Sequence, residues 1–258
     1  MIFIMARANP DYRRRIAEKF MSQYQNEELR KSFLEFHKNR ETMLIAITND
    51  KLFPLKKIRN LKYDALESFD YVIGGKFKFW KEPYNIYYSC ARYKNGIPIF
   101  YYTGDSKEIV KQRQTIWKQN CHKEAVSFDM ALDVDSPDFK SLKIAAQDTA
   151  RIYKKFAKKH DDVSIRFSGC GFHLVAPNCW KGEGITDKDI MKIRKEAEGY
   201  KKTISDLVDT HVIEPRRVIK TPGTLVYKEG YRYIMKCKII SFEELENFNM
   251  ENYIYEKL

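Results

Sequence analysis

The 258-residue sequence lacks the features of a secreted, disulfide-linked or zinc-bound protein. Its five cysteines are odd in number and no two form a C-x-x-C pair, so neither a disulfide framework nor a zinc site is predicted. The opening MIFIMARANP has a short apolar run but no cleavage-site pattern, so no signal peptide is predicted. No stretch approaches the ~20 apolar residues that a membrane span requires. We therefore expect a soluble, cytoplasmic protein with no membrane partner.

Internal repeats, low-complexity tracts and linkers rich in Pro, Gly or Ser are also missing. With a hydrophobic fraction of 43%, the chain can bury one proper interior, and its length suits one large domain or two small modules that share a core.

Negative charge is scarce, because the net charge is +12 and the sequence pI is near 9.3. The basic runs are dispersed over residues 13–15, 56–59, 154–159 and 216–220, which favours a folded cationic groove or face over a flexible basic arm. Aromatic residues reach 14%, and aromatic rings are also the surfaces on which bases stack. Nucleic acid is therefore the first partner to consider. A lysine-rich surface that serves only solubility remains the alternative.

Hydrophobic periodicity predicts an α+β fold. A helix is expected over residues 11–38, and two strands over 85–93 and 97–102 are expected to form a hairpin. From residue 126 the expected order is strand, helix, strand, strand, helix, strand, strand, at 126–135, 142–156, 164–168, 172–177, 186–206, 217–220 and 231–240. This order is typical of a βαββαβ sheet with its helices on one side, the ferredoxin-like or RNA-recognition-motif arrangement.

The first chemical motif is Asp133–Val134–Asp135. Side chains alternate along a strand, so the two carboxylates share a face about 6.5–7 Å apart at their backbones. No Lys or Arg in VSFDMALDVD neutralises their repulsion, whereas hard divalent cations, which prefer oxygen ligands, would do so. A D-x-D on the polar face of a half-buried strand is common, so a motif that binds no metal remains the alternative.

Two further motifs concern phosphate. In Ser168–Gly169–Cys170–Gly171–Phe172–His173, two glycines permit a tight turn with accessible backbone amides, Ser168 can donate a hydrogen bond, and His173 begins the returning strand. Residues 207–228 place Asp209 after a helix, where it can complete a carboxylate triad, and then supply cations suited to a triphosphate. These cations are Arg217, Lys220 and Lys228. A packed histidine and a solvated basic strand are the alternatives.

Together, MALDVDSPD, RFSGCGFHLVAP and VDTHVIEPRRVIKTPGTLVYK resemble, in order, the motifs of the archaeo-eukaryotic primase superfamily. The resemblance covers roughly residues 126–230, and NIYYSCARY resembles a segment that precedes the first motif in some plasmid and viral members. Val226 stands where many cellular members have histidine, and the zinc-binding cysteine cluster of cellular small subunits is not apparent. These departures indicate a divergent archaeal or mobile-element member.

The resemblance implies a single primase–polymerase domain over 1–258, with an N-terminal α/β module (1–120) and an RNA-recognition-motif-like catalytic core (121–258). It implies a DNA primase or DNA-directed polymerase that performs template-dependent nucleotidyl transfer in replication, associated with the nucleoid. The implied partners are a single-stranded DNA template, a primer strand, NTP or dNTP, and a helicase or large-subunit-like accessory protein. Asp133, Asp135 and Asp209 would be the catalytic ligands of two Mg²⁺ or Mn²⁺ ions. Nucleotide contacts fall to Ser168, Gly169, His173, Arg217, Lys220 and Lys228.

Two other functions remain open. A replication-initiator or relaxase-type nuclease can share a similar sheet, but it usually needs paired histidines and a nucleophilic tyrosine. No His-x-His occurs here, although Tyr87 and Tyr88 are available. A non-catalytic single-strand-binding module would explain the charge and the aromatics, but it leaves the three carboxylates without a role.

Overall fold

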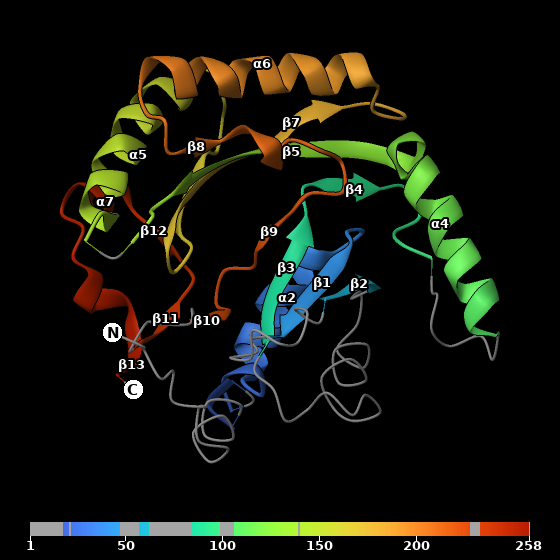
Figure 1. The fold of residues 1–258 in the computed structure, drawn as a ribbon, viewed down its shortest axis with the longest axis horizontal. Coiled ribbons are helices and arrows are strands. Elements are labelled where there is room, and N and C mark those ends of the chain that lie inside the picture. Colours follow the sequence, from blue (N-terminus) through green and yellow to red (C-terminus); the bar gives the residue numbers. More distant parts are fainter. Residues whose placement is uncertain are drawn as a thin grey trace, which may run out of the picture.

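The computed structural model describes residues 18–20, 22–46, 57–61, 84–98, 106–138, 140–227 and 233–257. These residues form three antiparallel sheets with helices packed around them, so the predicted α+β class is confirmed (Figure 1). Among the described helices, none combines the length and the apolar character needed to cross a membrane.

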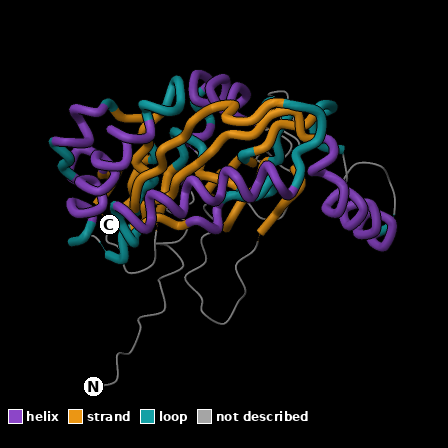
Figure 2. The backbone as a smooth tube through the Cα atoms, turned by 90° about the horizontal axis from the view of Figure 1, so that it is seen from above, coloured by secondary structure: helices purple, strands orange, loops and turns teal. Residues whose placement is uncertain are grey.

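The largest sheet has six strands in the order β12-β6-β7-β5-β4, with the short β8 paired to the free edge of β5. Its strands are β4 (Ala91–Tyr93), β5 (Ala125–Asp135), β6 (Ser164–Phe167), β7 (Gly171–Lys181), β8 (Val208–Asp209) and β12 (Lys238–Ile240). Helices α5 (Leu142–Phe156) and α6 (Asp187–Thr203) cover one face (Figures 1 and 2). The residues predicted to be the apolar face of the first helix are buried in α5: Leu142, Ala145, Ala146, Thr149, Ile152 and Phe156.

A four-stranded sheet in the order β2-β1-β3-β9 lies on the other side of the six-stranded sheet (Figure 1). Its strands are β1 (Thr42–Ala46), β2 (Lys57–Leu61), β3 (Tyr84–Ser89) and β9 (Val218–Lys220). The third sheet is β10-β11-β13, formed by Leu225–Tyr227, Tyr233–Lys236 and Ile254–Lys257. The remaining helices are α2 (Glu27–His37), α4 (Lys107–Glu124), α7 (Phe242–Glu246) and the 3-10 turns Thr210–Val212 and Met250–Tyr253.

The sheets do not follow the two halves of the chain. β4 precedes residue 120 yet belongs to the six-stranded sheet, while β9 follows it yet pairs with β3. The strand predicted at 217–220 therefore forms, but β8 takes the place beside β5 where a fourth core strand was expected. The division of the chain into 1–120 and 121–258 stays a prediction.

Three predicted elements are interrupted. The helix expected over 11–38 breaks at Asn26, whose side chain accepts a hydrogen bond from the Leu29 amide and so begins α2. The strands expected at 85–93 and 231–240 each divide between two sheets, at Cys90 and Cys237. Each cysteine is fully buried, and its amide donates to a distant carbonyl, that of Arg217 or Thr224 respectively. Of the strand expected at 97–102, residues 97–98 are irregular and 99–102 lie outside the described residues.

Two helices begin with a capping box. Thr186 and Asp189 form a reciprocal capping box that begins α6, and Ser241 and Glu244 form another that begins α7. α6 ends at Thr203, three residues before the predicted end at residue 206.

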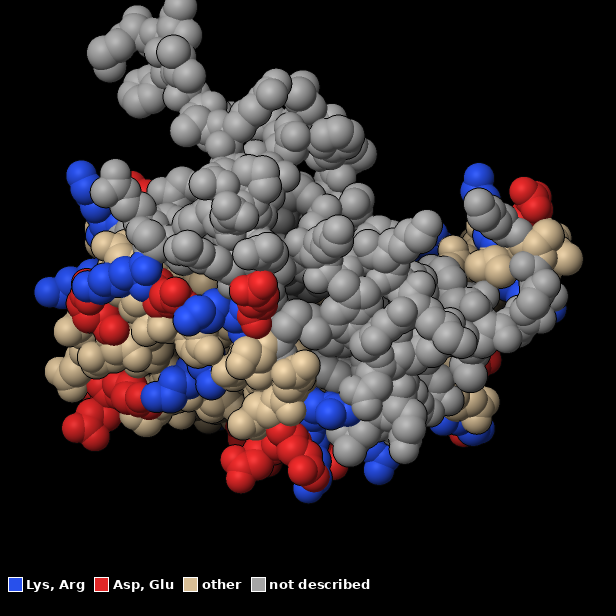
Figure 3. Space-filling model, turned by 90° about the horizontal axis from the view of Figure 1, so that it is seen from below, with Lys and Arg blue, Asp and Glu red and all other residues tan. Residues whose placement is uncertain are grey.

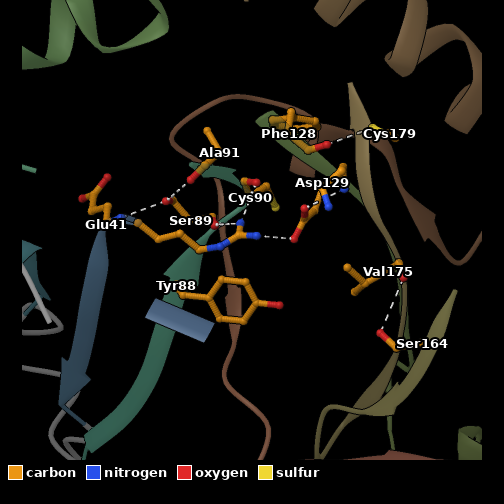
Figure 4. Close-up of polar contacts among 12 residues, drawn as sticks. Glu41, Tyr88, Ser89, Cys90, Ala91, Phe128, Asp129, Ser164, Val175 and Cys179 are labelled. Atoms are coloured by element: carbon orange, nitrogen blue, oxygen red, sulfur yellow. Dashed lines mark hydrogen bonds and ion pairs between the residues drawn. The ribbon is translucent and has the colours of Figure 1, made fainter. Parts of the chain in front are cut away.

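A buried ion pair joins the two larger sheets (Figure 4). Arg40 Nη2 lies 2.6 Å from Asp129 Oδ2, and the two side chains are only 2% and 5% exposed. Arg40 Nη1 also donates to the carbonyls of Ser89 and Cys90, where the chain passes from β3 to β4. The second oxygen of Asp129 accepts from the amide of Asn178 on β7. One guanidinium thus fixes the crossing point between the sheets and anchors it to β5.

We expect Asp129→Ala to lower the free energy of unfolding by about 3–5 kcal/mol, because it leaves the buried Arg40 charge without its partner. Asp206→Ala is the matched control, since Asp206 is exposed, and it should change stability by less than about 0.5 kcal/mol. Urea denaturation of both variants tests this. Equal stabilities would show that the pair does not hold the sheets together.

A second buried polar group, His37 on α2, links that helix to β1 and to the residue after β9. Its Nδ1 lies 2.6 Å from Thr42 Oγ1 and its Nε2 lies 2.9 Å from Thr221 Oγ1. Burial, assisted by the nearby Arg40 charge, lowers the pKa of His37 to about 3. The imidazole is therefore neutral in the folded chain at neutral pH.

Because this folded-state pKa lies below the unfolded value near 6.5, only the unfolded chain gains a proton as the pH falls. His37 therefore contributes no penalty above pH 6.5 and a growing one below it. Relative to His37→Gln, the wild type should lose about 1.4 kcal/mol of stability between roughly pH 7.5 and 5.5. Urea melts of both proteins at the two pH values measure this. A difference between the two proteins that does not change with pH would contradict the buried, neutral state.

Candidate active site

A row of polar side chains crosses the six-stranded sheet on one face. Asp133 on β5 lies directly opposite Asp209 on β8 and His173 on β7, and His173 lies opposite Arg166 on β6. Directly opposed residues of antiparallel strands share a face, so these four side chains form one row. The residues next to them along the strands point to the other face and are fully buried in the core: Val134, Val208, Phe172 and Phe167. The row therefore lies on the face away from α5 and α6.

Asp133 is the centre of the row. Its carboxylate is 18% exposed, and its Oδ1 lies 3.4 Å from His173 Nε2 without a hydrogen-bond partner among the described residues. Burial raises the pKa of Asp133 to about 6; the Lys220 ammonium opposes this rise, and the Asp209 carboxylate adds to it. A buried carboxylate beside another carboxylate is a costly arrangement that a bound cation would relieve.

His173 is a neutral neighbour of this carboxylate. Burial is the largest cause that lowers the pKa of His173 to about 3, and the positive charges of Lys220 and Arg166 lower it further. The contact between His173 and Asp133 is therefore not an ion pair at neutral pH. The Nδ1 of His173 is buried and has no hydrogen-bond partner among the described residues. It leaves an unused polar atom beside Asp133.

The other two predicted carboxylates flank Asp133. Asp135 is exposed at the end of β5, opposite Gly171, and partial burial together with the Asp133 charge raises its pKa. Asp209 caps the turn that follows β8, accepting from the His211 amide at 2.8 Å, and its other oxygen lies 3.5 Å from Arg217 Nη2. The structure thus brings Asp133 and Asp209 together as cross-strand neighbours, with Asp135 next along the strand.

Two of the predicted cations approach from the four-stranded sheet. Lys220 on β9 donates to the carbonyl of Ser168 at 3.0 Å and contacts Cys170 Sγ at 3.4 Å, which ties β9 to the glycine-rich turn. Arg217, just before β9, is 44% exposed and contacts Asp209. Lys228, the third predicted cation, lies outside the described residues.

The glycine-rich turn between β6 and β7 is tightly packed. Gly169 has φ +91°, and a Cβ there would come within 2.8 Å of Val226 Cβ; a Cβ at Gly171 would come within 2.5 Å of the Val134 carbonyl. Only glycine fits both positions, because one needs left-handed backbone and the other lies against β5. Of the predicted nucleotide contacts, Ser168 and Gly169 are buried, as is His173.

The carboxylates fit a divalent cation in donor type. All are oxygen ligands, two are directly opposed across strands, and Asp133 holds an unsatisfied oxygen. Within the described part of the chain, no three His, Cys, Asp or Glu side chains are already gathered closely enough to make a metal site. The geometry therefore allows a cation without presenting a completed cage.

Two residues that were not predicted as part of this site lie near the row. Arg166 lies beside His173, donates to Ser164 Oγ and to the Tyr88 hydroxyl, and lies over the rings of Phe36 and Tyr88. Tyr87 is the cross-strand partner of Lys220. Alternation along β6 could have placed Arg166 on the same face as Ser168, but the pairing of Tyr87 with β9 has no local sequence signal.

We expect Gly169→Ala to destabilise the protein by about 1–3 kcal/mol, because alanine is strained at this φ and its Cβ would clash with Val226. Gly199→Ala is the matched control, since a Cβ at Gly199 meets no atom within 4 Å and alanine favours helix over glycine by up to about 1 kcal/mol. Thermal melts of both variants should shift in opposite directions. A Gly169→Ala protein as stable as wild type would contradict the described packing of the turn.

Comparisons with known proteins show the fold. No family model and no curated protein matches the sequence. Among solved structures, the chain is similar to the polymerase domain of Mycobacterium tuberculosis Ligase D, determined in complex with DNA. The TM-score is 0.54 at 11% sequence identity, and the alignment covers 90% of this chain and 83% of that chain. At this identity the similarity concerns architecture: the chain shares its fold with a DNA polymerase domain.

Proposed function

We propose that this protein is a nucleotidyl transferase of the primase–polymerase kind, which extends or starts nucleic-acid chains on a single-stranded DNA template. The observation that carries the proposal is the row of Asp209, Asp133 and His173 across one sheet face, with Lys220 above it. The fold shared with a polymerase domain supports the same reading. A catalytic core of the RNA-recognition-motif type, as the strand order β6-β7-β5-β8 suggests, is part of the proposal.

In this proposal Asp133, Asp135 and Asp209 hold two Mg²⁺ or Mn²⁺ ions. Bound divalent ions would lower the pKa of the attacking 3′-hydroxyl and stabilise charge on the α-phosphate. The protein itself would bring the three carboxylates together, two from the end of β5 and one from the paired strand β8, and its core would shield one side of them from water. The raised pKa of Asp133 shows that the fold places a carboxylate where its charge is poorly solvated.

The cationic residues would bind the triphosphate. Lys220 is held in place by the Ser168 carbonyl, and neighbouring acidic groups outweigh its burial and keep its pKa above the ordinary value, so it stays charged. Arg217 is exposed and can turn from Asp209 toward a phosphate. His173, being neutral, can donate one hydrogen bond without adding charge, and Lys228 would supply the remaining cation.

The two other functions fit the described residues less well. Tyr88, one candidate nucleophile of a nuclease, is only 1% exposed and its hydroxyl contacts Arg166. A base-stacking module needs rings at the surface. In the part of the chain that the structure describes, the large exposed hydrophobic side chains include one aromatic, Tyr255 on β13.

We expect Asp133→Asn to reduce primer extension by at least about a thousandfold. Several kcal/mol of transition-state stabilisation would be lost, at about 1.4 kcal/mol per tenfold. Stability should not fall, because the substitution removes a charge that burial disfavours. The assay supplies a single-stranded template, all eight nucleotides and Mg²⁺ or Mn²⁺, with and without an annealed primer, and a thermal melt is recorded alongside.

Asp206→Asn is the control, since Asp206 is an exposed aspartate three residues from Asp209. Asp129 is unsuitable as a control because its loss would break the Arg40 pair. New chains made without primer would identify a primase, and products only with primer would identify an extending polymerase. Substantial synthesis by Asp133→Asn, or none by the wild type under either metal, would overturn the proposal.

A further inference from the structure

The outer face of α6 carries a stripe of lysines. Lys188, Lys192, Lys195 and Lys202 occupy positions i, i+4, i+7 and i+14, which lie on one side of an α-helix, and all four are exposed. The opposite side of the helix packs into the core through Ile190, Ala197 and Tyr200. We call these four residues the lysine stripe.

Among the described residues, no carboxylate lies within ion-pair distance of a lysine of the stripe. Glu196 points to a flank of the helix, where it accepts from Tyr200 and contacts His160 and Lys159. Asp189 is used by the capping box with Thr186. Four exposed lysines elsewhere in the described chain are each within ion-pair distance of a glutamate: Lys31, Lys154, Lys238 and Lys257. None of the four lysines of the stripe is therefore held in a close ion pair. Asp189 interacts electrostatically with Lys188 and Lys192, and Glu198 lies three residues after Lys195 and four before Lys202, so the stripe keeps an excess of positive charge rather than a fully uncompensated one.

Gly199 lies at position i+11 of the same stripe, between Lys195 and Lys202. A Cβ there would meet no atom within 4 Å, so packing within the chain does not require glycine. Glycine is unfavourable inside a helix, and its presence leaves the backbone bare in the middle of the stripe. A partner can therefore approach the helix more closely at this point than a side chain would allow.

The dimensions and charge of the stripe suit a nucleic-acid backbone. Fourteen residues of helix span about 21 Å, along which a polynucleotide presents a continuous series of phosphates. Lysine binds phosphate as a point charge and needs no fixed pocket. On the face seen in Figure 3, by contrast, blue and red side chains lie next to each other over the described part.

We propose that the lysine stripe is a second nucleic-acid-binding surface, on the opposite side of the six-stranded sheet from the Asp133 row. Figure 1 shows α6 on the outside of the sheet and β9, which carries Lys220, on the other side. A strand held on α6 is thus separate from one that occupies the candidate active site. The stripe would retain a flanking part of the nucleic acid while its end is at the carboxylates.

The test compares two quadruple variants with the same charge change. One replaces Lys188, Lys192, Lys195 and Lys202 with Gln. The control replaces the paired lysines Lys31, Lys154, Lys238 and Lys257 with Gln. Each lowers the net charge from +12 to +8. Binding to a duplex and to a single strand of the same sequence is measured by fluorescence anisotropy over a series of KCl concentrations, without nucleotides or divalent metal. Circular dichroism checks that both variants keep their helix content.

The stripe variant should lose about tenfold or more in affinity, and the slope of log K against log salt should fall by about 3 for either DNA. The control variant should lose much less affinity, and its slope of log K against log salt should change much less. Comparing the loss of affinity for the duplex with that for the single strand shows which form of DNA the stripe binds. Equal losses by the two variants would mean that only net charge matters, and would overturn the proposal.

A further arm uses poly-glutamate as an acidic-polypeptide probe. If the stripe variant loses binding to poly-glutamate but keeps its affinity for both DNAs, the surface serves an acidic protein and the proposal is wrong. Because every readout is binding without synthesis, the result is independent of whether the protein transfers nucleotides.

Discussion

The geometry of this protein depends on the placement of one buried guanidinium. Arg40 and Asp129 are both almost completely removed from water, and backbone partners help to offset the cost, although the Arg40 Nε has no hydrogen-bond partner among the described residues. The pair fixes the point where the chain leaves the four-stranded sheet for the six-stranded one. β9 pairs with β3 directly beside that point, so the position of Lys220 over the glycine-rich turn follows from it. A contact outside the candidate active site thus helps to determine where Lys220, the proposed phosphate-binding cation, lies.

The candidate active site shows the opposite balance, because its charges are left partly unsatisfied. Asp133 has an oxygen with no hydrogen-bond partner among the described residues, and burial raises its pKa toward neutrality. His173 beside it is neutral and carries an unused nitrogen. Proteins keep such costly arrangements where a ligand is to complete them, whereas structural charges are paired, as Arg40 and Asp129 are.

Sequence patterns predicted the features that depend on contacts between residues close together in the chain. The alternation along β5, the buried face of α5 and both capping boxes follow from side-chain spacing within a few residues. The divisions at Cys90 and Cys237 could not be predicted, because amides there bond to segments distant in the sequence. For the same reason the two-residue strand β8 was missed, although Asp209 itself was chosen correctly as a neighbour of Asp133. Arg166 was overlooked because its role depends on the β6–β7 register.

The cations behind the net charge of +12 lie in two different electrostatic environments in this fold. Lys220 and Arg217 lie among carboxylates, so they offset local negative charge and contribute little to the field far from the molecule. The lysines of the stripe are not held in close ion pairs, although Asp189 interacts with Lys188 and Lys192, and the remaining field extends outward over about a Debye length, roughly 10 Å at 0.1 M salt. Composition alone cannot separate these two groups of cations, since both count equally in the sum. The fold separates them by position, since one group lies beside the Asp133 row and the other lies on the outer face of α6.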